Sequence, residues 1–252
     1  MLPEYSLALW GGILAVTVIA GFVKGTVGFA MPMIMISGLG SLLPAETAIA
    51  ALIIPTLVTN AFQAFRGGRI AVWQSAKRHK RYVAIVLVMI LFSAQLVAIL
   101  PQWALFLILG VPVVVFAAIQ LAGIHFTIPP ERRLAADIGI GGTAGFFGGL
   151  SGVWGPPTVL YLTALDTPKA EQMRVQGIVY GMGAVMLTLA HINSGVFNMT
   201  SAPLSVLLLA PALVGMALGT RVSDRLDQQK FRKATLVVLV FAGLNLIRRG
   251  LM

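Results

Sequence analysis

The residues with the clearest potential for chemistry lie in a pattern of glycine and proline that occurs twice in the chain. The copies are GFVKGTVGFAMP at residues 21–32 and GFFGGLSGVWGP at residues 145–156, and a further proline follows each at the same offset, Pro44 and Pro168. Glycine and proline at matching places in apolar stretches predict a helix that is interrupted within a membrane. The chain is expected to turn at Gly25 and Gly28 in the first copy and at Gly149 and Gly152 in the second. Such an interruption exposes backbone N–H groups and the positive end of a helix dipole, which together favour an anion.

Two cationic side chains near these interruptions are candidates for binding an anionic ligand. Lys24 lies within the first copy, in an apolar surround, and ionisable residues inside a membrane are usually functional. The alternative is that the Lys24 side chain snorkels to the membrane surface. Arg174 lies in the apolar segment after the second copy, where its planar guanidinium could clamp an oxyanion or pair with Glu171.

The remaining candidates are the glycines and prolines of the two copies and the polar or aromatic residues near them. We expect ligand contacts from these positions: Gly25, Thr26, Gly28, Pro32 and Asn60 with the first copy, and Gly149, Ser151, Gly152, Trp154, Pro156, Thr158 and Gln176 with the second. Gln63 and Tyr180 could face the same cavity. For each polar side chain, a contact between two helices is at least as good an interpretation. For the glycines the alternative is close helix packing, but the duplication of the pattern favours a binding site.

The residue types that are missing narrow the chemistry further. The chain has no cysteine, and no set of His, Asp and Glu has the spacing of a metal site or of a catalytic constellation. We therefore expect no metal, no cofactor and no enzyme activity. None of the acidic residues lies at the centre of a predicted span. Cation carriers usually keep a carboxylate at that depth, so the presence of Lys24 there favours an anionic cargo.

The composition is that of a protein with many membrane-spanning helices. Of 252 residues, 58% are hydrophobic and 10% are charged, whereas a soluble domain carries about 25% charged residues. The net charge of +10 comes from lysine and arginine in short segments between apolar stretches. This distribution is typical of cytoplasmic loops and does not indicate nucleic-acid binding. We expect no removable signal peptide, because the N-terminus lacks a basic region and a cleavage site.

The apolar segments predict an all-α polytopic membrane protein built from two repeats, residues 1–127 and residues 128–252. Each repeat is expected to contain a broken or half-helix pair and three transmembrane helices. The predicted elements are the pair over 6–43 and helices over 47–65, 82–100 and 103–124, then the pair over 134–165 and helices over 172–192, 204–220 and 234–247. A full crossing needs about 20 apolar residues, which the second member of each pair lacks.

The distribution of basic residues predicts how the repeats are oriented. Neutral connections at 101–102 and 193–203 alternate with basic segments at 66–81, 132–133 and 221–233. The basic segments are assigned to the cytoplasm, which places the N-terminus outside. Equivalent connections of the two repeats differ in charge, and each repeat has an odd number of crossings. The repeats are therefore predicted to have inverted topology, with a pseudo-two-fold axis in the membrane plane.

The two copies of the pattern resemble the paired motifs of the sulfite exporter TauE/SafE family of membrane transporters. The resemblance rests on residues 21–32 and 145–157, and it extends over essentially the whole chain in length, duplication and basic loops. It implies a bacterial inner-membrane carrier for sulfite, for sulfonates such as sulfoacetate, or for related small anions, often in export. The implied partners are that anion and the lipid bilayer, and a homodimer is a further expectation.

These inferences combine into a secondary transporter of small anions that works by alternating access. We expect the cargo to be sulfite or an organosulfonate and the direction to be export. The alternatives from other classes are a gated anion channel, a membrane enzyme and an assembly factor. A carrier for a small carboxylate without sulfur is the alternative within transport.

Overall fold

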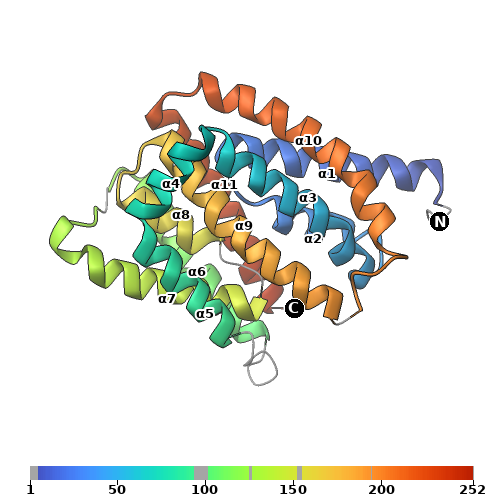
Figure 1. Cartoon of the computed structure of the whole chain (residues 1–252), viewed down its shortest axis with the longest axis horizontal. Helices are drawn as coiled ribbons and strands as arrows, with labels where there is room; N and C mark the ends of the chain where they lie inside the picture. The colour runs from blue at the N-terminus through green and yellow to red at the C-terminus, as the bar shows by residue number, and fades with distance from the viewer. Residues whose placement is uncertain (1–4, 94–101, 125–126, 152–154, 194, 252) are drawn as a thin grey trace. The chain divides into compact units, whose positions relative to one another are not determined.

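All regular structure in the described part of the chain is helical, which confirms the predicted all-α fold. The computed structural model describes residues 5–93, 102–124, 127–151, 155–193 and 195–251 (Figure 1). In chain order the helices are α1 (Leu7–Val27), α2 (Met31–Leu39), α3 (Ala45–Phe65), α4 (Gly68–Arg78), α5 (Lys80–Ser93), α6 (Gln102–Leu121), the 3-10 helix η2 (Pro130–Arg132), α7 (Arg133–Ser151), α8 (Gly155–Ala164), α9 (Lys169–Asn193), α10 (Ala202–Arg225) and α11 (Gln228–Leu251).

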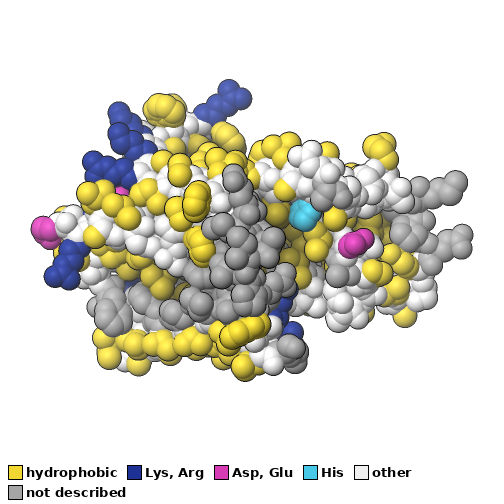
Figure 2. Space-filling view, turned by 90° about the horizontal axis from the view of Figure 1, so that it is seen from below, with side chains coloured by type: hydrophobic (Ala, Val, Ile, Leu, Met, Phe, Trp, Pro, Cys, Tyr) yellow, Lys and Arg dark blue, Asp and Glu magenta, His cyan; other side chains and the backbone are white. Residues whose placement is uncertain are grey.

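Several of these helices are long and apolar enough to cross a bilayer. Over the described residues there are five of them: α1, residues Glu46–Phe65 of α3, α9, α10 and α11. Many large hydrophobic side chains remain exposed on these helices, and Figure 2 shows a face rich in such side chains. Extensive apolar surface of this kind is suited to lipid, so the chain is a multi-pass membrane protein.

The predicted spans correspond closely to observed helices. Four of them lie within α3, α9, α10 and α11: residues 47–65, 172–192, 204–220 and 234–247. The span predicted over 103–124 corresponds to α6, which ends at Leu121. The span predicted over 82–100 begins within α5, and its part after Ser93 lies outside the described residues.

Two segments predicted as basic loops are largely helical. Residues 66–81 contain α4 and the first residues of α5, and α10 continues to Arg225, which leaves Leu226 and Asp227 before α11. The prediction of loops is wrong here because it was drawn from charge alone. Charge indicates on which side of a membrane a segment lies, but lysine and arginine are also good helix formers.

Contacts divide the helices into two compact units, and each is described by itself. Unit 1 contains Met1–Gln63 and Ala184–Leu226, and unit 2 contains Ala64–Gly183 and Asp227–Met252. This division is based on contacts, whereas a repeat is defined by duplication, so one does not test the other. The two repeats and their inverted topology therefore stay predictions.

In unit 1, α1 and α10 lie side by side with their backbones in direct contact (Figure 1). A Cβ atom on Gly25 would lie 2.2 Å from the carbonyl oxygen of Met216, and one on Gly219 would lie 2.0 Å from that of Phe22. A Cβ atom on Gly21 would meet the backbone of α10 at 2.3 Å. No side chain fits at these three positions, so two glycines of the repeated pattern are needed for helix packing.

The short helix α2 is held in unit 1 by one buried stripe. Met31, Met35 and Leu39 recur every four residues and are fully buried. They belong to a hydrophobic core with residues of α1, α3 and α10, among them Ile13, Ala20, Ala48, Ala51, Leu52, Leu204, Leu208 and Ala212. Burial of this stripe fixes which side of α2 faces its neighbours.

A proline inside α3 is compensated by a serine of α10. Pro55 has no N–H group, so the carbonyl of Ala51 loses its helical donor. The hydroxyl of Ser205 donates to Ala51 O at 3.1 Å and accepts from the N–H of Ile54 at 3.0 Å. Ser205 is fully buried, and it thereby ties α10 to the turn of α3 that contains the proline.

Unit 2 uses close backbone contact in two further helix pairs. α5 packs on α7, where a Cβ atom on Gly145 would lie 2.4 Å from the carbonyl oxygen of Val86. α6 packs on α11, where a Cβ atom on Gly110 would lie 2.9 Å from the carbonyl oxygen of Gly243. The first glycine of each copy of the pattern, Gly21 or Gly145, is therefore a packing residue.

We predict that replacing Ser205 by alanine destabilises the protein by roughly 1–3 kcal/mol, because the carbonyl of Ala51, which Pro55 already deprives of its helical donor, is left buried without a partner. Thermal unfolding of the purified protein in detergent measures this effect. The matched control is Ser41→Ala, since the Ser41 hydroxyl bonds to a carbonyl at an exposed position. Equal unfolding temperatures for the two variants would contradict the role assigned to Ser205.

Candidate functional site

The first interruption lies in unit 1, between α1 and α2. α1 ends at Val27, and Gly28 follows with a φ of 89° and donates its N–H to the carbonyl of Lys24 at 2.7 Å. Glycine adopts this left-handed conformation without a steric cost. The chain therefore turns at Gly28, whereas Gly25 lies inside α1, so the expectation that Gly25 also forms the turn is wrong.

Ala30 precedes α2 with an unusual backbone conformation. Its φ is 74°, a left-handed value that costs a residue with a Cβ atom roughly 1–2 kcal/mol. Its side chain makes no capping hydrogen bond to α2, and Pro32 in the first turn has no N–H group. The N–H groups at the start of α2 thus lack the usual cap within the described chain, and a bound anion could be their acceptor.

Lys24 lies in the last turn of α1, close to this interruption. Its side chain is 1% exposed, and its ammonium group donates to the amide oxygen of Asn60 on α3. Among the residues that the structure describes, Lys24 contacts no carboxylate. One neutral acceptor leaves the buried positive charge uncompensated, because a lysine carries three N–H donors and a full charge. This depth of burial excludes the alternative that Lys24 snorkels to a surface.

α3 makes a second contact with the first interruption. The side-chain amide of Gln63 donates from Nε2 to the carbonyl oxygen of Gly28 at 3.0 Å. Because Asn60 bonds to Lys24, α3 contacts both the end of α1 and the turn that follows it. The structure therefore brings two of the predicted polar residues, Asn60 and Gln63, to the interruption.

These two residues belong to a buried polar face of α3. Thr56, Thr59, Asn60 and Gln63 follow at i, i+3, i+4 and i+7, and all four are buried. The Thr59 hydroxyl lies 3.8 Å from the sulfur of Met31 at the start of α2. The Thr56 hydroxyl has no hydrogen-bond partner among the described residues. The sequence analysis missed both threonines, although their helical spacing from Asn60 could have revealed them.

Thr26 lies on α1 but is engaged with α10. Its hydroxyl donates to the carbonyl of Phe22 at 2.9 Å and to that of Gly219 at 3.3 Å. For Thr26, the structure therefore favours the alternative of a polar contact between helices.

The place of the second predicted interruption, here called the second interruption, lies in unit 2 between the described residues of α7 and α8. α7 ends at Ser151, and α8 begins at Gly155. Two predicted site residues, Gly152 and Trp154, lie outside the described residues. Gly149 lies within α7, so the expectation that the chain turns at Gly149 is wrong.

Tyrosines from two other helices of unit 2 contact the start of α8. The hydroxyl of Tyr180 on α9 donates to the carbonyl oxygen of Gly155 at 3.0 Å. The hydroxyl of Tyr82 on α5 donates to that of Thr158 at 3.0 Å. Pro156 and Thr158 are both buried. The predicted residues Thr158 and Tyr180 therefore lie together at the second interruption.

A buried aromatic pair extends this cluster. The rings of Tyr82 and Tyr161 stack with centroids 4.0 Å apart, and Tyr161 donates its hydroxyl proton to Asp137 at 2.5 Å. Asp137 is buried in the second turn of α7, away from the interruption. Gln176 of α9 is also buried. The sequence analysis missed Tyr82, Tyr161 and Asp137, because their spacing in the sequence gives no sign that they meet.

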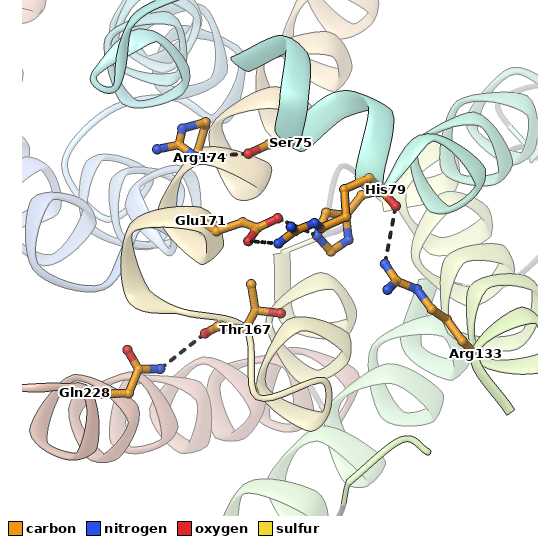
Figure 3. A network of polar contacts seen from close by, with 8 residues as sticks. Ser75, His79, Arg133, Thr167, Glu171, Arg174 and Gln228 are labelled. Atoms are coloured by element: carbon orange, nitrogen blue, oxygen red, sulfur yellow. Dashed lines mark hydrogen bonds and ion pairs between the residues drawn. The ribbon is translucent and has the colours of Figure 1, made fainter. Parts of the chain in front are cut away.

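Arg174 of α9 is directed toward α4, as Figure 3 shows. Its Nη1 donates to the hydroxyl of Ser75 at 3.0 Å. The predicted alternative partner, Glu171, instead contacts Arg78 at 2.8 Å and His79 at 3.3 Å. The described contacts therefore do not support the alternative of an ion pair between Arg174 and Glu171, and Arg174 joins α9 to α4.

A model of the protein family described as Sulfite exporter TauE/SafE matches residues 13–246. The chain belongs to the sulfite exporter TauE/SafE family. This family consists of membrane transporters, which agrees with the long apolar helices. No curated protein and no solved structure matches the chain.

The first interruption offers chemistry that suits a small anion. Lys24 supplies a buried positive charge, and the start of α2 supplies N–H donors. Sulfite and sulfonate groups carry several oxygen acceptors, which both kinds of donor can bind. The described residues contain no group of three His, Asp or Glu that could hold a metal ion.

We predict that the left-handed conformation of Ala30 makes this position intolerant of β-branched residues. Ala30→Val should lower stability by more than about 2 kcal/mol, whereas Ala30→Gly should be close to neutral, because glycine removes the backbone strain while losing one buried methyl group. Thermal unfolding in detergent compares the two variants directly. Equal tolerance of valine and glycine would mean that residue 30 does not hold this conformation in solution.

Proposed function

We propose that the chain exports small sulfur-containing oxyanions, such as sulfite or an organosulfonate, as a secondary transporter with alternating access. The observation that carries the proposal is the buried ammonium of Lys24, whose described contact is the neutral amide of Asn60. An unpaired charge in a protein interior is costly, and a bound oxyanion would remove that cost. The family to which the chain belongs supports sulfur oxyanions as the cargo.

The shape of the first interruption supports binding of a compact anion. The N–H groups at the start of α2 carry partial positive charge, and the ammonium of Lys24 carries a full positive charge. In the chain, these hydrogen-bond donors lie on either side of the turn at Gly28. A lysine acts as a compact point charge and does not impose the planar fork geometry of an arginine. It therefore suits a small pyramidal or tetrahedral oxyanion whose orientation is set by backbone donors.

The second interruption supports an alternating-access mechanism. Each copy of the pattern includes the last residues of one helix and the first residues of a short helix, α1 and α2 in the first copy and α7 and α8 in the second. In inverted-repeat transporters, paired half-helices of this kind form the substrate site, and the two repeats move against each other around it. Within unit 1, Lys24 is the electrostatic anchor of the proposed site.

Replacing Lys24 by methionine gives opposite expectations for stability and for binding. The unfolding temperature should stay the same or rise, because methionine removes a desolvated charge while filling most of the space of the lysine side chain with an unbranched apolar one. The affinity for sulfite should fall about tenfold or more, because one charge-assisted hydrogen bond is lost. Sulfite-dependent thermal shift of the purified protein measures both quantities, with the exposed Lys80→Met as the matched control.

Proteoliposomes preloaded with unlabelled sulfite test transport itself. The unaltered protein should accumulate labelled sulfite by counterflow, and Lys24→Met should not. Flux without counterflow would identify a channel instead, and stronger competition by lactate than by sulfite or sulfoacetate would contradict a sulfur-containing cargo. Unchanged sulfite affinity in Lys24→Met would remove this residue from the site.

A further inference from the structure

A separate feature of unit 2 lies in the basic segment of residues 66–81. This segment carries six lysine or arginine residues and no acidic residue. Helix α4 occupies its centre, and Ser75 is the buried residue of that helix. Such a local excess of positive charge attracts a negatively charged partner.

The outward side of α4 combines this charge with large apolar side chains. Ile70, Trp73 and Lys77 follow at i, i+3 and i+7 and therefore share one face. Ile70 is 76% exposed and Trp73 is 72% exposed, and these two residues are here called the apolar stripe of α4. Arg69 borders the same face. A helix with this arrangement lies in the headgroup layer of a membrane, with tryptophan and isoleucine at the acyl boundary and cations near phosphate.

The opposite side of α4 is fixed within unit 2 by polar contacts (Figure 3). Ser75 accepts a hydrogen bond from Arg174, and Arg78 pairs with Glu171 at 2.8 Å. The carbonyl oxygen of Arg78 also accepts from Arg133 of α7 at 3.3 Å. These contacts determine which side of α4 faces outward, so the exposure of the apolar stripe does not result from a loosely attached helix.

His79, directly after α4, completes this attachment. Its Nε2 lies 3.3 Å from Oε1 of Glu171, and its ring meets the edge of Tyr161 at a centroid distance of 6.2 Å. Burial lowers the pKa of His79 below its ordinary value, although the Glu171 carboxylate acts in the opposite direction. The positive charge of the segment comes from its lysine and arginine residues.

We propose that α4 binds anionic phospholipids, with the apolar stripe at the acyl boundary and with Arg69 and Lys77 on the headgroup phosphate. Charge complementarity selects an anionic partner, because the segment offers cations and no carboxylate. The apolar stripe selects a lipid over a soluble anion, which would leave Ile70 and Trp73 in water. Each lysine or arginine at an anionic leaflet strengthens binding roughly fivefold. This inference goes beyond the proposed transport and does not depend on the cargo.

The test uses the full chain in nanodiscs of phosphatidylcholine alone or mixed with phosphatidylglycerol. Hydrogen exchange of the α4 amides should slow when phosphatidylglycerol is present. Replacing Arg69 and Lys77 together by glutamine should weaken the apparent lipid affinity about 25-fold, fivefold for each charge. The matched control replaces Arg221 and Lys230, two exposed cations outside α4, by glutamine and should leave the response unchanged.

A second pair of substitutions tests the apolar stripe. Ile70→Ser combined with Trp73→Ser should speed exchange of α4 in both lipid mixtures. The proposal is overturned if α4 exchange is independent of lipid charge, or if the control pair loses the response as the Arg69 and Lys77 pair does. It is also overturned if soluble glycerol phosphate reproduces the protection, which would indicate a free-anion site. Loss of a dimer in the serine variant with an unchanged lipid response would assign the stripe to contact between copies.

Discussion

The positive charge of Lys24 inside unit 1 is the constraint on which the candidate site depends. A buried ammonium is tolerated where polar groups or an anion compensate it. Asn60 supplies an acceptor, which reduces the cost of desolvation but leaves the net charge. The start of α2 adds N–H groups that also carry positive charge, and Ala30 provides no side-chain cap for them. Both features disfavour a cation and favour an anion, in agreement with membership of a family of sulfite exporters.

One short pattern meets two different physical requirements in this chain. Gly21 and Gly25 have no room for a side chain, because the backbone of α10 touches them. Gly28 is needed for another reason, since its φ of 89° is strained for any residue with a Cβ atom. In the second copy, Gly145 packs against α5 as Gly21 packs against α10. The earlier glycines of the pattern therefore allow close helix packing, and a later glycine allows the chain to leave the helix.

Most of the fold could be predicted from the sequence, because membrane helices are long and continuously apolar. Part of the site could also be predicted, since Asn60 and Gln63 share a helical face and reach the first interruption. The contact of Arg174 with Ser75 could not be predicted from the sequence, because 99 positions separate the two residues and no periodicity relates positions on different helices. The helical state of α4 was missed for a different reason: charge carries information about membrane sidedness and little about conformation.

The interlocked backbones of α1 and α10 also restrict how unit 1 can rearrange. Sliding one helix along the other would drive carbonyl oxygens into Cα atoms, so the two behave as a single rigid rod. The turn at Gly28 is itself tied to α3 by the hydrogen bond from Gln63, and α2 is held against α1 and α10 by its buried stripe. Movement of α2 away from this rod would expose Met31, Met35 and Leu39, so α2 and the ammonium of Lys24 are held in one packed assembly within unit 1.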